Sequence, residues 1–153
     1  MLASLLDHLP TCMDRACRGC VVRQPPGSSV CGPACVATVV GVSLETAVVA
    51  VGTRGATSAR LLATALARYG YHLGRAQCAP YGVLPPSRPG VVAHLLRLNW
   101  GRPRPTHWAL LRDGHVLDPA HGVDPHLQPG RSWPPRTRVM SSYPITRDGE
   151  GGT

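Results

Sequence analysis

A cysteine at the start of a small, apolar helix is the feature that most restricts how this 153-residue chain can fold. Residues 28–41 read SSVCGPACVATVVG. Gly32 leaves space beside Cys31, and Pro33 falls in the first turn of a helix, where a missing N–H costs nothing. The valines and alanines that follow predict a helix that has to be buried, and Gly41 is a stop signal.

This pattern places the Cys31 sulfur at the positive end of a buried helix, where the nucleophilic thiolate form of a cysteine is favoured. The alternative is a structural cysteine, because unreactive cysteines are commonly buried in helices. The helix by itself does not separate the two interpretations.

Length and charge limit the class of protein. The length suits one domain with one core. The formal net charge is +8, and all 16 Lys and Arg positions are arginine. Such a charge permits binding to nucleic acid, which stays open as an alternative function. No nucleic-acid motif accompanies the charge. We therefore interpret the positive charge as an aid to solubility and a result of biased composition.

The first ten residues do not form a secretory signal, because they lack a basic lead and Asp7, His8 and Pro10 break their apolar run. No apolar run is long enough to span a membrane. We therefore expect a cytoplasmic protein, or one delivered into a host cell without a classical signal peptide. In a reducing compartment its six cysteines are expected to be thiols.

Four potential zinc ligands lie near the start of the chain. His8, Cys12, Cys17 and Cys20 have the order and spacing of a metal site, with one C-x2-C pair. A structural zinc site usually shows two such pairs. We therefore favour metal-free thiols in an irregular N-terminal segment, residues 1–20, and keep a zinc site as the alternative.

Two further helices are predicted after Gly41. Ser43 is expected to cap a helix over residues 44–51. Thr57 or Ser58 is expected to cap a third helix, which Gly70 ends. The N-terminal half of the domain is therefore predicted to be helical.

The second half predicts strands. Residues 71–76 alternate as a strand. Residues 91–98 are apolar enough for a central strand, and their Leu-rich end leaves a helix as the alternative. Asp113-Gly114 between two apolar runs predicts a tight hairpin over residues 107–118. A short strand near residues 139–140 is expected to return to the sheet. The domain is predicted to span residues 21–145, followed by a disordered tail, residues 146–153.

The hairpin turn fixes which side chains share a face. Arg112 should oppose His115, and Ala109 should oppose Asp118. His107 and Asp118 are then diagonal neighbours with Cβ atoms roughly 7–8 Å apart, so the carboxylate can orient the imidazole. With a helix-start cysteine, they complete a nucleophile, base and orienter set.

Simpler interpretations exist for each of these residues. His107 alone fits a strand-start histidine satisfied by the backbone, and Asp118 alone fits a turn residue before Pro119. His94 is a rival base, which we interpret as a core or edge histidine. The shared face and the helix-start cysteine favour the catalytic interpretation.

These motifs resemble, in order, those of the papain-like cysteine peptidases, over roughly residues 22 to 122. The motifs are Gln24, C-G-P-A-C from Cys31, G-V-S-L-E from Gly41, His107-Trp108, and D-P-A from Asp118. The chain looks most similar to the bacteriocin-processing, double-glycine peptidase family (family 39 of the cysteine peptidases) and its stand-alone relatives.

The resemblance implies a role for each matching residue. Cys31 would be the nucleophile and Cys35 a core residue, while His107 would be the base and Asp118 its orienter. Gln24 would supply a side-chain N–H to the oxyanion hole. The family usually has five residues between this Gln and the Cys, whereas here six residues separate them.

The sequence therefore predicts an α+β, papain-like fold, with the nucleophile helix in an N-terminal helical half packed on a C-terminal antiparallel sheet. The expected function is hydrolysis of peptide bonds in a peptide or protein substrate, with no metal or organic cofactor required. Two alternatives remain open: a deamidase or transamidase acting on a protein side chain, and a peptide-binding domain without catalysis.

Overall fold

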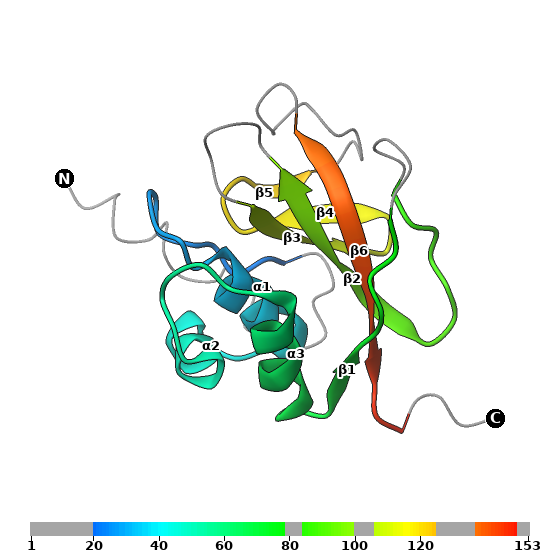
Figure 1. Ribbon diagram of the computed structural model, residues 1–153, viewed down its shortest axis with the longest axis horizontal. Coiled ribbons are helices and arrows are strands. Elements are labelled where there is room, and N and C mark those ends of the chain that lie inside the picture. Colours follow the sequence, from blue (N-terminus) through cyan, green and yellow to red (C-terminus); the bar gives the residue numbers. More distant parts are fainter. Residues whose placement is uncertain (1–19, 79–83, 100–105, 125–136, 150–153) are drawn as a thin grey trace.

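The computed structural model describes residues 20–78, 84–99, 106–124 and 137–149 of the chain. Three helices gather on one side of a six-stranded sheet, so the fold is of the mixed α+β class (Figure 1). The elements are, in chain order, α1 (Cys31–Val40), α2 (Leu44–Val51), α3 (Ala59–Ala67), β1 (Tyr71–Leu73), β2 (Val91–Asn99), β3 (His107–Arg112), β4 (His115–Asp118), β5 (Gly122–Asp124) and β6 (Arg138–Arg147).

Local capping sets the limits of α1 and α2 as the sequence predicted, whereas α3 ends at Ala67, before the predicted stop at Gly70. Helices α1 and α2 end at Gly41 and Gly52, whose φ angles of 80° and 88° suit glycine. The side chain of Ser43 caps α2 by accepting the N–H of Thr46 at 3.1 Å. Ser58 caps α3 in the same way. These short-range contacts confirm the predicted helical half.

The hairpin of β3 and β4 has the predicted register, with Arg112 opposite His115. Its turn residues Asp113 and Gly114 have φ angles of 50° and 77°. Two consecutive positive φ angles define the primed turn that matches the twist of paired strands. The turn therefore fixes which residues of β3 and β4 share a face.

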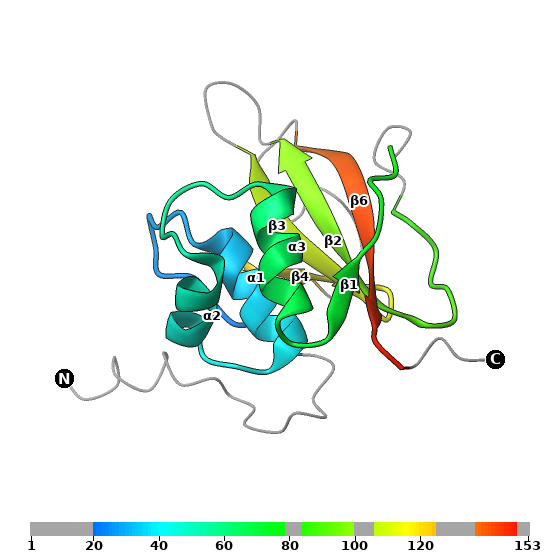
Figure 2. The ribbon, with the colours of Figure 1, turned by 60° about the horizontal axis from the view of Figure 1, so that its bottom comes forward.

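The edges of the sheet differ from expectation. The strand order is β1-β6-β2-β3-β4-β5, and all five neighbouring pairs are antiparallel. Strand β6 pairs with β1 on one edge and with β2 on the other, and it runs beside β2 in Figure 2. It extends to Arg147, two residues past the predicted domain end at 145. Strand β1 stops at Leu73, short of the predicted 76, and β5 was not predicted.

The central strands are buried on both faces. Because successive side chains of a strand point to opposite faces, neighbouring residues of β2 and β3 enter different clusters. Leu95 and Leu110 pack with the helices, whereas Leu96 and Leu111 belong to a second cluster on the other face. Burial on both faces explains the uninterrupted apolar run of β2.

Among the described residues, no single helix is both long and apolar enough to cross a membrane. Helices α1 and α2 meet the length and composition requirement only as a pair bent by 113°.

Candidate active site

Cys31 is the first residue of α1, and its side chain is nearly buried. Val30 at the N-cap makes no side-chain hydrogen bond to the helix, and the first turn holds no acidic residue. Neither a cap nor a carboxylate therefore neutralises the positive end of this helix. An anion at the Cys31 position would be stabilised by the helix dipole.

The start of α1 is packed against the loop before α3. A Cβ added at Gly32 would collide with the Thr57 side chain and come within 3.0 Å of Leu62 Cδ2. Thr57 also accepts a hydrogen bond through its carbonyl oxygen from Trp108 Nε1–H, at 3.1 Å. This loop therefore connects the start of α1 to β3.

His107 and Asp118 meet as the hairpin geometry predicted. His107 begins β3, Asp118 ends β4, and the two side chains are only 4% and 1% exposed. His107 Nε2 lies 2.7 Å from Asp118 Oδ1. This distance is that of a strong, charge-assisted hydrogen bond, which fixes the orientation of the imidazole ring.

The Cys31 thiol reaches the same imidazole. Hydrogen bonding and charge interaction with Cys31 contribute to the raised pKa of His107, although the two residues come from α1 and β3. The three residues singled out from the sequence are therefore brought together as a series from sulfur to imidazole to carboxylate.

The environment of His107 favours its charged form. Burial alone lowers the pKa of His107, but hydrogen bonds and charge interactions with Asp118 and Cys31 outweigh burial and raise the pKa to about 9. At neutral pH the imidazole is therefore protonated and lies between a carboxylate and the thiol. A cationic imidazole next to a cysteine stabilises the thiolate.

A tight turn after β4 holds the carboxylate. Asp118 Oδ1 accepts a second hydrogen bond, from the backbone N–H of Ala120 at 2.8 Å. The Asp118 carbonyl oxygen accepts the N–H of His121 at 3.2 Å. These contacts orient the carboxylate toward His107.

Gln24 lies in the loop before α1, where the resemblance implied an oxyanion-hole donor. Its Nε2 donates to the Ser28 carbonyl oxygen at 2.9 Å, and its buried Oε1 has no hydrogen-bond partner among the described residues. The Ser28 N–H closes a turn onto Pro25 at 3.1 Å, with Gly27 at a φ of 74°. This turn accommodates the additional residue between Gln24 and Cys31.

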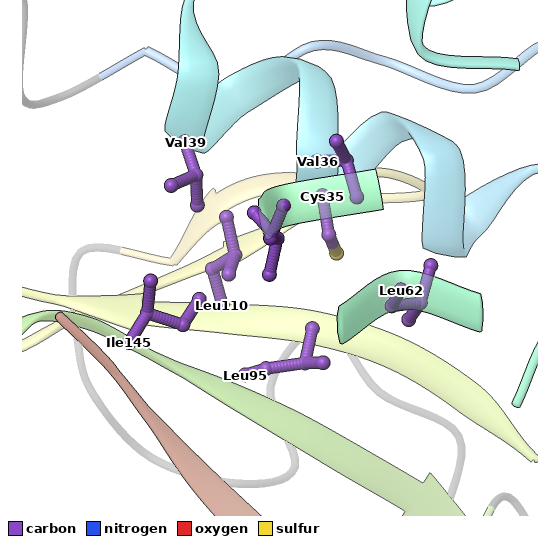
Figure 3. Close-up of a pocket in the computed structure, with 8 residues that line it drawn as sticks. Cys35, Val36, Val39, Leu62, Leu95, Leu110 and Ile145 are labelled. Carbon is purple, nitrogen blue, oxygen red and sulfur yellow. The ribbon is translucent and has the colours of Figure 1, made fainter. Parts of the chain in front are cut away.

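Cys35 lies one turn further along α1 and is directed into the core. Figure 3 shows its sulfur in the interior between α1 and the sheet, near Leu62 and Leu110. Burial, followed by the charges of Cys31 and Asp118, raises the pKa of Cys35 well above the usual thiol value. Cys35 is therefore a protonated core residue.

The other histidines that the structure describes lie away from this group. His94 is buried in β2 opposite Leu111 and Pro144, and burial followed by the charge of Arg88 lowers its pKa. His115 and His121 are exposed. Of the candidate zinc ligands, only the half-buried Cys20 is described, and His8, Cys12 and Cys17 lie outside the described residues. Within the described part of the chain, no group of three metal-ligating side chains is found.

Neither Arg23 nor Thr57 was predicted to contribute to the candidate site. Arg23 donates from Nε to the Pro119 carbonyl oxygen at 3.2 Å and from Nη2 to the Ala120 carbonyl oxygen at 2.9 Å. Its position next to Gln24 was the only available signal, because it otherwise resembles the other arginines. Thr57 was noted only as a potential helix cap, and Ser58 has that role.

Comparison of the chain with protein-family models, with curated proteins and with solved structures finds no match.

Proposed function

We propose that this chain is a cysteine peptidase in which Cys31 is the nucleophile, His107 the general acid and base, and Asp118 the group that orients His107. One observation carries the proposal: His107 hydrogen-bonds to Asp118 and interacts with Cys31, which links the three residues across three elements. A nucleophile, a base within hydrogen-bond reach and an orienting group are the parts that covalent acyl transfer needs.

The placement of these parts supports a papain-like arrangement. The helical half carries the thiol at the start of α1, and the antiparallel sheet carries the histidine and the acid. The reacting groups then lie where the two halves meet. This relationship, together with the motif order from Gln24 to Asp118, is the basis for proposing the papain-like fold.

The first chemical step forms an acyl-enzyme. The Cys31 thiolate attacks the carbonyl carbon of a peptide bond, and the carbonyl π electrons move to the oxygen. The tetrahedral intermediate collapses, the C–N bond breaks, and the proton of His107 is transferred to the leaving amine. A thioester to Cys31 and a neutral His107 remain.

The second step hydrolyses the thioester. Neutral His107 accepts a proton from water as the water oxygen attacks the thioester carbon. The C–S bond breaks, the carboxylic acid product leaves, and Cys31 and His107 return as thiolate and imidazolium. Asp118 keeps its charge throughout and stabilises each imidazolium form.

The oxyanion would be stabilised at the start of α1. The Cys31 backbone N–H belongs to the uncapped first turn, which can donate to the developing negative charge. Gln24 Nε2 uses one of its two hydrogens on Ser28, which leaves the other for the oxyanion. We assign both donors to the oxyanion hole. The substrate class is a peptide or protein, and the mechanism requires no cofactor.

The test compares the wild type with Cys31→Ala and with Cys35→Ala, its matched control on the same helix. Each protein is incubated with a panel of peptides, and the products are identified by intact mass. We expect the wild type and Cys35→Ala to cleave, and Cys31→Ala to be about 10³-fold slower or worse.

Three results would overturn parts of the proposal. Cleavage that survives in Cys31→Ala would show that Cys31 is not the nucleophile and would assign that role to Cys35. A mass gain of one unit without chain cleavage would identify a deamidase that uses the same three residues. Equal alkylation rates of Cys31 and Cys35 at neutral pH would exclude an activated thiol and favour binding without catalysis.

A further inference from the structure

Residues 22–24 form a short connection between α1 and the turn that follows Asp118. At one end, Val22 N–H donates at 2.9 Å to Oγ1 of Thr38, a residue of α1. At the other end, Gln24 N–H donates to the Pro119 carbonyl oxygen at 2.9 Å. The segment therefore ties the element that carries the nucleophile to the element that carries the acid.

Arg23 lies in the middle of this connection, and its side chain hydrogen-bonds to the same turn. Its Nε and Nη2 donate to the Pro119 and Ala120 carbonyl oxygens at 3.2 and 2.9 Å. A Cβ added at Gly122 would lie 3.0 Å from Arg23 Nη1, so the guanidinium also lies against this glycine, whose φ is 95°. The planar guanidinium thus holds the turn from Pro119 to Gly122 at three places.

The turn that Arg23 holds is the one that orients the carboxylate. Ala120 accepts from Arg23 through its carbonyl oxygen and donates its N–H to Asp118 Oδ1 at 2.8 Å. The same Oδ1 lies 2.7 Å from His107 Nε2. A shift of Ala120 would therefore move the oxygen that fixes the imidazole.

We infer that Arg23 is a positioning residue for the proposed reaction, acting through the Ala120 turn to keep Asp118 Oδ1 on His107. Its contribution comes from the two-pronged geometry of the guanidinium more than from its charge, because its acceptors are carbonyl oxygens. The effect of Arg23 on catalysis rests on the proposed function. The contacts of Arg23 with the turn are independent of that function.

The groups facing His107 define what the test should measure. Among the described residues, the titratable groups that act on His107 are Cys31 from α1 and Asp118 from β4. Cys35, one turn along α1, is coupled to the same two groups. Loosening Asp118 weakens the interactions that keep His107 charged, and so reduces the thiolate at Cys31.

The experiment compares Arg23→Met and Arg23→Lys with two controls. Arg54→Met removes an exposed arginine that pairs with Glu45 far from the turn. Thr38→Val removes the acceptor for Val22 and loosens the same connection without touching Arg23. Each protein is titrated by NMR at His107, alkylated at Cys31 at neutral pH and unfolded with urea.

We expect the pKa of His107 in Arg23→Met to fall by about one unit and Cys31 alkylation to slow by about 10-fold. Arg23→Lys should recover only part of both effects, because an ammonium cannot match the guanidinium fork. Both controls should keep the wild-type titration and alkylation rate, while Thr38→Val is less stable.

The inference is overturned if Arg23→Met keeps the wild-type His107 titration while its stability falls, because Arg23 would then be structural only. It is equally overturned if Thr38→Val shifts the titration as far as Arg23→Met does. The proposed function fails by a different result: a wild-type Cys31 that alkylates no faster than Cys35.

Discussion

His107 Nε2 lies 2.7 Å from Asp118 Oδ1, and the two side chains are 4% and 1% exposed. The imidazole is thus fixed through Nε2, and the same ring interacts with Cys31. Because water is nearly excluded, the charge interaction between the two groups is screened less than at a surface. The first two predictions follow from this pair.

Replacing the Asp118 carboxylate by an amide should remove its negative charge and leave a side chain of similar shape beside His107. In Asp118→Asn, burial is no longer balanced by a negative charge, so the pKa of His107 should fall from about 9. We expect peptide cleavage to slow by about 10³-fold, because neutral His107 cannot stabilise the Cys31 thiolate. Asp113→Asn, the same change in the exposed hairpin turn, is the matched control and should cleave at the wild-type rate. Equal rates in the two variants would contradict the role of Asp118.

The raised pKa of His107 predicts how stability depends on pH. Its pKa rises from 6.5 to about 9 on folding, so its full contribution is present below pH 6.5 and is lost as the pH rises through about 9. We expect the free energy of unfolding to decrease by on the order of 1–3 kcal/mol across this window. Urea unfolding on both sides of the window measures the change, and His107→Gln should lack it. Stability that increased with pH in the wild type alone would refute the assigned charge state.

Gly32 should tolerate no side chain. In Gly32→Ala, the new Cβ would collide with the Thr57 side chain and press on Leu62 Cδ2 at 3.0 Å. We expect a loss of about 1–3 kcal/mol in the free energy of unfolding and slower alkylation of the neighbouring Cys31. Gly55→Ala is the control, because only Thr53 Oγ1 lies near its Cβ position, at 3.5 Å. A Gly32→Ala protein as stable as Gly55→Ala would show that the Thr57 loop moves easily.

The indole N–H of Trp108 should contribute to the junction between the sheet and the Thr57 loop. Trp108→Phe removes its hydrogen bond to the Thr57 carbonyl oxygen and keeps an aromatic ring beside Tyr143, whose ring centroid lies 6.0 Å away. We expect a loss of about 1–2 kcal/mol in the free energy of unfolding. Tyr143→Leu tests the ring contact separately. If Trp108→Phe is as stable as the wild type, the hydrogen bond does not hold the loop.

Strand β6 shows where prediction from local sequence failed. Only a short strand near residues 139–140 was expected, whereas β6 continues through Pro144, which has no N–H and is unusual inside a strand. In the structure the Pro144 carbonyl oxygen still accepts the Gly74 N–H at 2.8 Å, and β6 pairs with both β1 and β2. Pairing on two sides compensates for one missing donor, and a single-strand pattern cannot reveal its neighbours.

Arg23 shows the same limit at the candidate site. Its acceptors, Pro119 and Ala120, are 96 and 97 residues away in the chain. Nothing beside Arg23 in the sequence marks those carbonyl oxygens. Cys31, His107 and Asp118 could be selected because a helix start and a two-residue turn each impose their geometry locally.

The sequence by itself determined the limits of α1 and α2, the start of α3, the register of the hairpin and the shared face of His107 and Asp118. Caps, turn glycines and the two-residue repeat of strands act over a few neighbouring residues, so they can be recognised without the fold. Only the tertiary structure decided the position of β6 between β1 and β2, the hydrogen bonds of Arg23 to the Ala120 turn, and the interaction of Cys31 with His107. Those contacts depend on packing between segments distant in the chain, whose free energy no local pattern encodes.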